Sequence, residues 1–282
     1  MRLLALLGLA CILSAADSTV ERARKLYNVT EFDQSLKILQ SVPVKNAEVY
    51  ELMGRNFYMQ GDFKRATEAL ENAVAAAPAE SNSALWLARA YGRRAETSSP
   101  FTAPGYASKA RTFFEKSVQL NPRNLDAIND LFEYYLEAPG FLGGGLDKAQ
   151  SLVPRISQIN EGEGQWAQAK LAEKRKQFST AEDHLRRAIQ AAPHQVGRFI
   201  DLARFLAKQG RYQEAEESFL AAEKVAPDSP KLLYAKADLY IKAGRNLQVA
   251  RDLLKRYMSL PLTPEDPPRA DAAKLLKQAQ GS

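Results

Sequence analysis

A unit of 34 residues that recurs along the chain constrains the fold more than any other feature of the sequence. Residues 47–80 and 196–229 carry the same residue classes at the same intervals. The shared positions are Tyr50, Met53, Gly54, Phe57, Gly61, Phe63, Ala66, Leu70, Ala73 and Pro78 in the first stretch, and Phe199, Leu202, Ala203, Leu206, Gly210, Tyr212, Ala215, Phe219, Ala222 and Pro227 in the second. A fixed period of this length predicts a stack of similar units, each packed mainly on its neighbours.

The spacing inside the unit predicts two helices joined by a turn. Apolar residues three and four apart give each half of the unit one apolar face. Gly61 and Gly210 stand where the chain must turn, and glycine tolerates the positive φ that such a turn requires. Pro78 and Pro227 follow the second half, where proline ends a helix because it has no N–H to donate.

Altered copies of the unit cover the rest of the chain. Their ranges are 20–45 (a degenerate opening copy), 81–124, 125–161, 162–195 and 230–263, and residues 265–282 are interpreted as a C-terminal capping helix and tail. An insertion within Thr97–Gly105 is expected to separate the two helices of the 81–124 copy, and a glycine-rich insertion is expected to do so in the 125–161 copy. The array is therefore expected to span residues 17–264, with no separate catalytic domain beside it.

The recurring unit resembles the tetratricopeptide repeat, and the two regular copies fill every signature position of that family. The resemblance extends from about Val20 to Gln280. It implies an all-α fold, a right-handed α-solenoid of about six to seven helix-turn-helix repeats with a C-terminal capping helix. No useful run of alternating apolar and polar residues interrupts it, so strands are not expected.

The resemblance also implies a non-enzymatic scaffold that binds a protein or an extended peptide. In this family the first helix of each pair lines a concave groove, and the residue after the small packing position faces that groove together with the residue one turn earlier. The predicted face consists of Glu51, Arg55, Arg89, Asn129, Glu133, Trp166, Lys170, Ile200, Arg204, Tyr234 and Asp238. Because aromatic and arginine side chains are common in binding hot spots, a partner with apolar and acidic side chains would suit this face.

Each residue of the predicted face also has a plainer interpretation. Trp166 suits a core position equally well, and any single charged side chain can simply be solvated. One variant of the family binds C-terminal carboxylates through a lysine and an asparagine. Glu51 and Arg55 stand at the matching positions, so that binding mode is not expected here.

The first 16 residues predict a secretory signal peptide. Arg2 is followed by a short apolar run and then by Ser14, Ala15 and Ala16, which suit cleavage after Ala16. Export to the periplasm or secretion is therefore expected. The alternative is a lipid-anchored envelope assembly or secretion-complex factor attached through Cys11, although Gly8 stands where lipoprotein signals usually have leucine. No later segment is apolar enough to span a membrane.

No catalytic, cofactor-binding or metal-binding residues are predicted. The two histidines, His184 and His194, are interpreted as surface residues, because a metal site needs three or four convergent ligands. The net charge of +6 comes from basic residues interleaved with acidic ones, which argues against a nucleic-acid partner. The expected partner is thus a protein or peptide, and the sequence specifies neither its identity nor the oligomeric state.

The glycine-rich stretch Gly140–Lys148 invites comparison with a phosphate-binding loop. It lacks the Gly-Lys-Ser/Thr ending of such loops and follows a predicted helix instead of a strand. We interpret it as an enlarged turn that begins after Pro139. A minor prediction remains that free amides at the start of the following helix hold an anion or a partner carboxylate.

Overall fold

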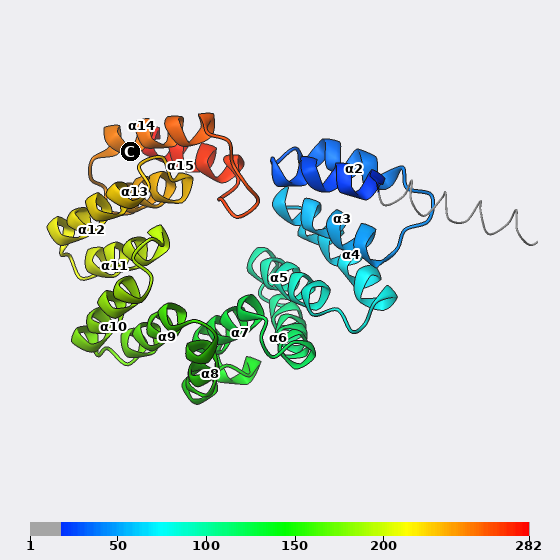
Figure 1. The fold of residues 1–282 in the computed structure, drawn as a ribbon, viewed down its shortest axis with the longest axis horizontal. Helices are drawn as coiled ribbons and strands as arrows, with labels where there is room; N and C mark the ends of the chain where they lie inside the picture. Colours follow the sequence, from blue (N-terminus) through cyan, green and yellow to red (C-terminus); the bar gives the residue numbers. More distant parts are fainter. Residues whose placement is uncertain (1–17, 282) are drawn as a thin grey trace, which may run out of the picture. The chain divides into compact units, whose positions relative to one another are not determined.

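The structure, a computed structural model, describes residues 18–281, which form an all-α solenoid without strands (Figure 1). The expected all-α class is therefore confirmed. A helix over residues 18–28 is followed by α2 (Phe32–Gln40), α3 (Ala47–Met59), α4 (Phe63–Ala76), α5 (Ser81–Thr97), α6 (Ala103–Leu120), α7 (Leu125–Glu137), the short 3₁₀ helix η1 (Gly140–Leu142), α8 (Leu146–Ile159), α9 (Glu161–Lys174), α10 (Phe178–Ala191), α11 (Val196–Lys208), α12 (Tyr212–Val225), α13 (Pro230–Lys242), α14 (Leu247–Ser259) and α15 (Arg269–Gly281). The expected signal peptide and Cys11 lie outside the described residues.

The chain divides into two compact units, with the boundary inside α7 after Leu131. Unit 1 comprises the described residues 18–131 and unit 2 comprises residues 132–281. In unit 1, α3 packs on α2, α4 and α5, and α5 packs on α6. One apolar cluster of unit 1 joins the helix over residues 18–28 to α3 through buried Tyr27, Val49 and Leu52.

Unit 2 is a succession of helices that each pack on their sequence neighbours, coloured green to red in Figure 1. One core cluster runs from α9 to α13 and includes Leu185, Phe219 and Leu232. A second cluster joins α13, α14 and α15 through residues such as Tyr257 and Ala272. The terminal helix α15 thus covers the apolar faces of α13 and α14.

The turns inside the helix pairs follow from local chemistry. Gly61 and Gly210 have φ values of 77°, the left-handed conformation that glycine adopts without strain. The Asn46 and Asp62 side chains accept hydrogen bonds from backbone amides in the first turns of α3 and α4, which caps both helices. At Gly54 an added Cβ would lie 2.4 Å from Cγ of Leu70, so α3 and α4 approach closely because this residue is small.

The insertion within Thr97–Gly105 lengthens the helices more than it separates them. Helix α5 has 17 residues and α6 has 18, compared with 13 and 14 in α3 and α4. Only residues 98–102 connect α5 to α6. The insertion was expected to separate the two helices, and only residues 98–102 of it do so.

The glycine-rich insertion forms an ordered turn whose amides are used internally. The amides of Gly143, Gly144 and Gly145 donate to the carbonyl oxygens of Gly140, Pro139 and Tyr135. These three amides are thus not available to an anion. The Lys148 ammonium likewise donates to the Gly143 carbonyl at 2.9 Å, which fastens the turn to the start of α8. The enlarged turn is confirmed. The predicted anion site consists of other amides, those at the start of α8, and it stays a prediction.

Candidate functional site

Arginine and aromatic side chains alternate across the first helices of unit 1. The Arg55 guanidinium carbon lies 4.9 Å from the centre of the Tyr27 ring and 4.7 Å from that of the Trp86 ring. The Arg89 guanidinium carbon lies 5.0 Å from the Trp86 ring, and the Tyr58 ring meets Trp86 edge-on at 5.4 Å. Such contacts combine dispersion with attraction between a cation and an aromatic face. We call Tyr27, Arg55, Tyr58, Trp86 and Arg89 the arginine–aromatic ladder.

The Arg89 end of the ladder is electrostatically satisfied. Arg89 Nε donates to a carboxylate oxygen of Asp130 at 2.5 Å, and Asp126 lies 3.9 Å away. Burial alone would lower the pKa of Arg89, but the two carboxylates outweigh burial and raise the pKa. Burial raises the pKa of Asp130, and Arg89 offsets only part of that shift. Arg89 is therefore paired with carboxylates while its guanidinium lies over the Trp86 ring.

Arg55 has weaker ion-pair and hydrogen-bond partners than Arg89. Its nearest carboxylate, on Glu51, lies 3.7 Å away, which is beyond hydrogen-bond distance. Arg55 Nε is buried and has no acceptor. Burial raises the pKa of neighbouring Tyr27, and the Arg55 cation opposes that shift. Arg55 thus combines a fixed position between two rings with unused capacity to donate hydrogen bonds.

A groove of about 510 Å³ adjoins Arg55. Its polar lining comprises Arg24, Asn46, Glu48, Glu51, Arg55, Glu80 and Ser83. Arg24 pairs with Glu48, and the Glu51 carboxylate accepts a hydrogen bond from the Ser83 hydroxyl at 2.5 Å. The groove therefore offers a mixed polar surface beside the exposed edges of the ladder, an arrangement suited to an extended chain with side chains of both kinds.

The residues predicted from the sequence are found in different settings. In unit 1, Glu51, Arg55 and Arg89 lie in the groove or ladder, and Asn129 is half-buried on α7. In unit 2, the predicted residues are Glu133, Trp166, Lys170, Ile200, Arg204, Tyr234 and Asp238. Of these, Glu133 is exposed on α7, and Arg204 and Asp238 line a depression between α11 and α13.

Two predicted residues of unit 2 are core residues. The side chain of Trp166 is 8% exposed and its ring lies 5.7 Å from that of Phe132, while Ile200 is 5% exposed within the α9–α13 cluster. The ammonium of Lys170 lies 5.9 Å from the Trp166 ring. Half-buried Tyr234 contacts the ring of Tyr257. The two buried residues thus supply packing and present little surface to a partner.

Sequence reasoning missed most of the aromatic half of the ladder. Tyr27 lies in the degenerate opening copy, and Tyr58 lies one turn after Arg55 on α3. Trp86 is half-exposed on α5, whereas its neighbour Leu85 is buried. The usable signal was the presence of an arginine after the small packing residue in two consecutive copies, with an aromatic residue three positions from each.

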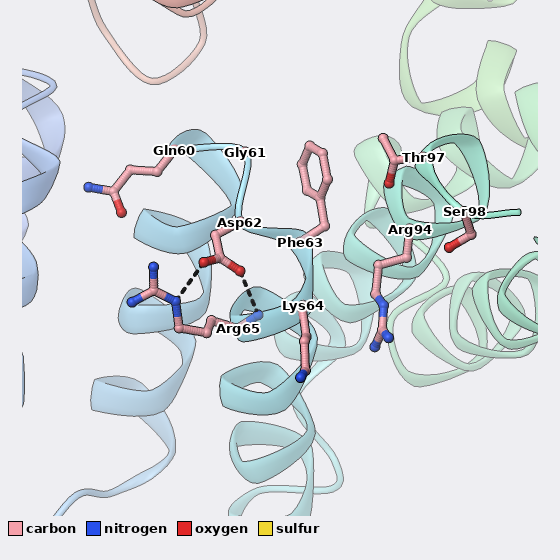
Figure 2. Close-up of a pocket in the computed structure, with 9 residues that line it drawn as sticks. All are labelled: Gln60, Gly61, Asp62, Phe63, Lys64, Arg65, Arg94, Thr97 and Ser98. Carbon is pink, nitrogen blue, oxygen red and sulfur yellow. Dashed lines mark hydrogen bonds and ion pairs between the residues drawn. The ribbon is translucent and has the colours of Figure 1, made fainter.

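A second depression of unit 1, of about 560 Å³, lies beside the α3–α4 turn (Figure 2). Its side chains do not converge: Figure 2 shows Gln60, Phe63 and Lys64 pointing in different directions. The Asp62 carboxylate is occupied by the backbone amide and Nε of Arg65. Arg94 is also engaged, because it donates to hydroxyl groups outside the depression. This depression is therefore a weaker candidate than the groove.

Residues 18–281 contain no group of three or more potential metal ligands and no helix long and apolar enough to cross a membrane. His184 Nδ1 lies 2.8 Å from the side-chain oxygen of Gln165. Burial and the nearby Arg187 lower the pKa of His184, so the imidazole is neutral at neutral pH. Its environment is that of a helix-packing residue.

Comparisons with known proteins find tetratricopeptide repeats in two parts of the chain. Tetratricopeptide repeat models match residues 52–96 and 172–239. A tetratricopeptide repeat protein from Parabacteroides merdae is similar in structure, with a TM-score of 0.60, 14% identity, and coverage of 94% of this chain and 98% of that one. One from Thermus thermophilus has a TM-score of 0.56 and 19% identity, covering 68% of this chain and 98% of that one. No curated protein matches the sequence.

The two solved structures share only low sequence identity with this chain, so they show the fold alone. The family models add the repeat signature itself, at the positions where α3 to α5 and α9 to α13 form their helix pairs. Proteins with this repeat generally bind protein partners and are generally non-enzymatic. The repeat models and the helix-pair fold together support the assignment of the chain as a tetratricopeptide repeat protein.

Proposed function

We propose that this protein is a non-enzymatic scaffold that binds an extended segment of another protein along the groove and ladder of unit 1. The observation that carries the proposal is the setting of Arg55, which is held between two aromatic rings yet has no carboxylate at hydrogen-bond distance. A structural arginine is normally satisfied, as Arg89 is by Asp130. An arginine that lies beside a groove and has unused N–H donors can bind a carboxylate of a partner through charge-assisted hydrogen bonds.

The same geometry defines the partner's chemistry. An acidic side chain at Arg55 would supply the hydrogen-bond acceptor that Glu51 is too distant to be, and a large apolar side chain beside it would cover the exposed part of Trp86. Both contacts use groups that are already positioned, so binding loses little side-chain entropy in the scaffold. Two of the three acidic residues of the groove, Glu48 and Glu51, already have partners in Arg24 and Ser83, and the third, Glu80, is exposed.

Quantitative co-purification from the native host tests this proposal. Trp86→Ala and Arg55→Gln should each reduce recovery of the same protein, with affinity falling about tenfold or more for the tryptophan change. Lys64→Gln is the matched control, because it removes a positive charge from an exposed residue of unit 1 outside the groove. The proposal would be contradicted if wild type and both groove variants recovered every protein equally while their circular dichroism stayed unchanged.

Tryptophan fluorescence gives a second readout once a partner is identified. The sequence contains two tryptophans, and Trp166 is buried in unit 2. In a Trp166→Phe background, emission therefore reports on Trp86 alone. Covering the half-exposed ring should shift that emission to shorter wavelength on addition of the partner. An emission spectrum that stays constant through saturation would place the partner elsewhere.

We also propose that the protein acts after export, as the residues before Asp17 suggest. Lipid attachment at Cys11 is the alternative, and it would make the same scaffold a membrane-tethered assembly factor. Intact-mass measurement of the protein from its native host separates the two. A chain that starts at Asp17 supports export with cleavage, a lipid-modified Cys11 supports the tether, and an uncleaved chain rejects both.

A further inference from the structure

Unit 2 has two adjacent depressions that share a wall. One, of about 260 Å³, lies between α11 and α13, and the other, of about 410 Å³, lies between α12 and α13. Tyr212, Leu239 and Ala243 line both depressions. We call this two-lobed surface the Tyr212 saddle. It lies at the end of the helix pairs where the turns are, and none of its residues belongs to the ladder of unit 1.

The shape of the saddle depends on turns that the sequence encodes. Gly210 and Gly244, with φ values of 77° and 62°, reverse the chain after α11 and after α13. The first reversal places Tyr212 at the start of α12, where 37% of the residue is exposed. The second places Arg245 so that its guanidinium carbon lies 4.6 Å from the Tyr212 ring centre. The ring is therefore held in a fixed position between the lobes.

Within the described part of the chain, some of the positively charged side chains around the saddle have no carboxylate partner. Its cations are Arg204, Lys208, Lys242 and Arg245. Lys208 pairs with Glu173 at 2.8 Å and Lys242 pairs with Asp238 at 2.8 Å. Among the described residues, no carboxylate lies within ion-pair distance of Arg204 or Arg245, although both arginines are exposed.

The acidic residues of the saddle are already engaged. The Glu216 carboxylate accepts a hydrogen bond from the Tyr240 hydroxyl at 2.5 Å and pairs with Lys236 at 2.6 Å. Asp238 is the partner of Lys242. The charge left over is therefore that of two arginines, one at each lobe, beside a lining of Ala207, Leu239 and Ala243.

We propose that the Tyr212 saddle is a second docking site, which binds an acidic protein segment with a large apolar side chain next to its carboxylates. The apolar side chain enters the lobe between α11 and α13, over Leu239 and Ala207. The carboxylates pair with Arg204 and Arg245, whose planar guanidinium groups suit bidentate recognition. The apolar lining is recessed between helices, which fits an inserted side chain and does not fit a flat lipid surface.

Fluorescence anisotropy of the full chain with a labelled peptide tests the site. The probe is Gly-Ser-Asp-Phe-Glu-Ser-Gly, with Gly-Ser-Lys-Phe-Lys-Ser-Gly and Gly-Ser-Asp-Ala-Glu-Ser-Gly as comparisons. The acidic phenylalanine peptide should bind, the other two should bind at least about tenfold more weakly, and binding should weaken as salt rises to about 0.5 M. Arg204→Gln and Arg245→Gln should each reduce the affinity about fivefold to tenfold.

Two controls make the result specific. Arg187→Gln removes an exposed arginine of unit 2 that does not line the saddle, and it should leave the affinity unchanged. Arg55→Gln should also leave it unchanged, because Arg55 belongs to the groove of unit 1. Failure of the saddle can therefore be distinguished from failure of the proposed function.

Several outcomes would contradict the proposal that the Tyr212 saddle binds an acidic segment. These are equal binding of the lysine peptide, wild-type affinity in both arginine variants, or no binding of the acidic phenylalanine peptide at about 1 mM. Sedimentation of the protein with phosphatidylglycerol vesicles, lost in the two arginine variants while the peptide fails to bind, would assign the surface to a membrane instead.

Discussion

Gly144 occupies a position that no other amino acid takes without movement of the backbone. A Cβ at this residue would lie 1.8 Å from the carbonyl oxygen of Ala138, which is far inside contact distance. The neighbouring glycines are also constrained, since Gly143 and Gly145 have φ values of 86° and 154°. Gly144 is thus explained by the close passage of the turn over the end of α7, and Gly143 and Gly145 are explained by their positive φ values.

Replacement of Gly144 by alanine should therefore destabilise the protein. We expect Gly144→Ala to lower the free energy of unfolding of unit 2 by about 2–4 kcal/mol, because a backbone segment must move. Gly140→Ala is the control, since a Cβ there meets nothing within 4 Å, and its effect should stay within about 1 kcal/mol. Urea denaturation followed by circular dichroism measures both. Equal effects from the two substitutions would show that the turn is not tightly packed.

The two tryptophans illustrate what sequence can and cannot predict for one residue. Both lie on first helices, yet Trp86 is half-exposed whereas Trp166 is 8% exposed against Phe132. The repeat pattern predicts which helix face a residue occupies. Its exposure depends on how closely a neighbouring first helix packs over that face, which involves side chains from another copy of the repeat.

This difference predicts different stability effects. Trp166→Ala should lower the free energy of unfolding by about 3–5 kcal/mol, as expected for a large side chain removed from a core. Trp86→Ala should cost about 1–2 kcal/mol, because part of its surface is already in water. Urea denaturation of the two variants tests the ranking. A larger loss from Trp86→Ala would mean that the ladder is primarily a packing element.

At the scale of elements, an ion network links α10 to α12. The Glu182 carboxylate on α10 pairs with Arg186 one turn later and with Arg211, which precedes α12. Hydrogen bonds from Arg211, then from Arg186, hold the pKa of Glu182 below its ordinary value of 4.5. Because the folded-state pKa is the lower one, the network contributes stability above about pH 4.5 and loses it as the pH falls through the folded-state value.

Glu182→Gln isolates this contribution. At about pH 7 the variant should be less stable than the wild type, and at about pH 3 the difference should be smaller, because the wild-type carboxyl begins to take up a proton as the pH falls toward its lowered pKa. Glu217→Gln, which changes a charged residue of α12 outside the network, serves as the control. Thermal unfolding at the two pH values gives the comparison. A stability difference that does not change with pH would contradict the proposed linkage.

The helix pairs and their glycine turns could be predicted because apolar spacing and glycine act locally, as Gly61 and Gly210 show. The lengths of α5 and α6 could not be predicted from the sequence. An insertion within Thr97–Gly105 was expected to separate the two helices, but Pro104 lies in the first turn of α6, where a proline lacks no needed hydrogen bond. A proline begins a helix when it lies in the first turn, and it ends a helix when it lies beyond the last turn. Its position relative to the helix boundary therefore matters.

At the scale of the whole molecule, the division into two units follows from nearest-neighbour packing. Each helix contacts mainly the helices next to it in sequence, so a local change is felt over few repeats. The ladder belongs to unit 1 and the Tyr212 saddle to unit 2, and the two proposed sites are therefore energetically separable.

Hydrogen exchange measured by mass spectrometry checks this separation. In the Gly144→Ala variant, exchange should accelerate in α8 to α10 while α3 to α5 keep wild-type protection. The loss of stability should be local to the altered turn, because each repeat packs mainly on its neighbours and helices several repeats away keep their contacts. Uniform acceleration along the whole described chain would instead indicate a single cooperative unit.

The central claim, that the groove of unit 1 receives a protein partner, is tested most directly by photo-crosslinking in the native host. A benzophenone side chain in place of Glu80, an exposed residue that lines the groove, should capture one protein. That product should disappear with Arg55→Gln and should not form from Asn72, an exposed α4 residue outside the groove lining. Capture of the same protein from Asn72, or undiminished capture in the Arg55→Gln variant, would contradict the claim.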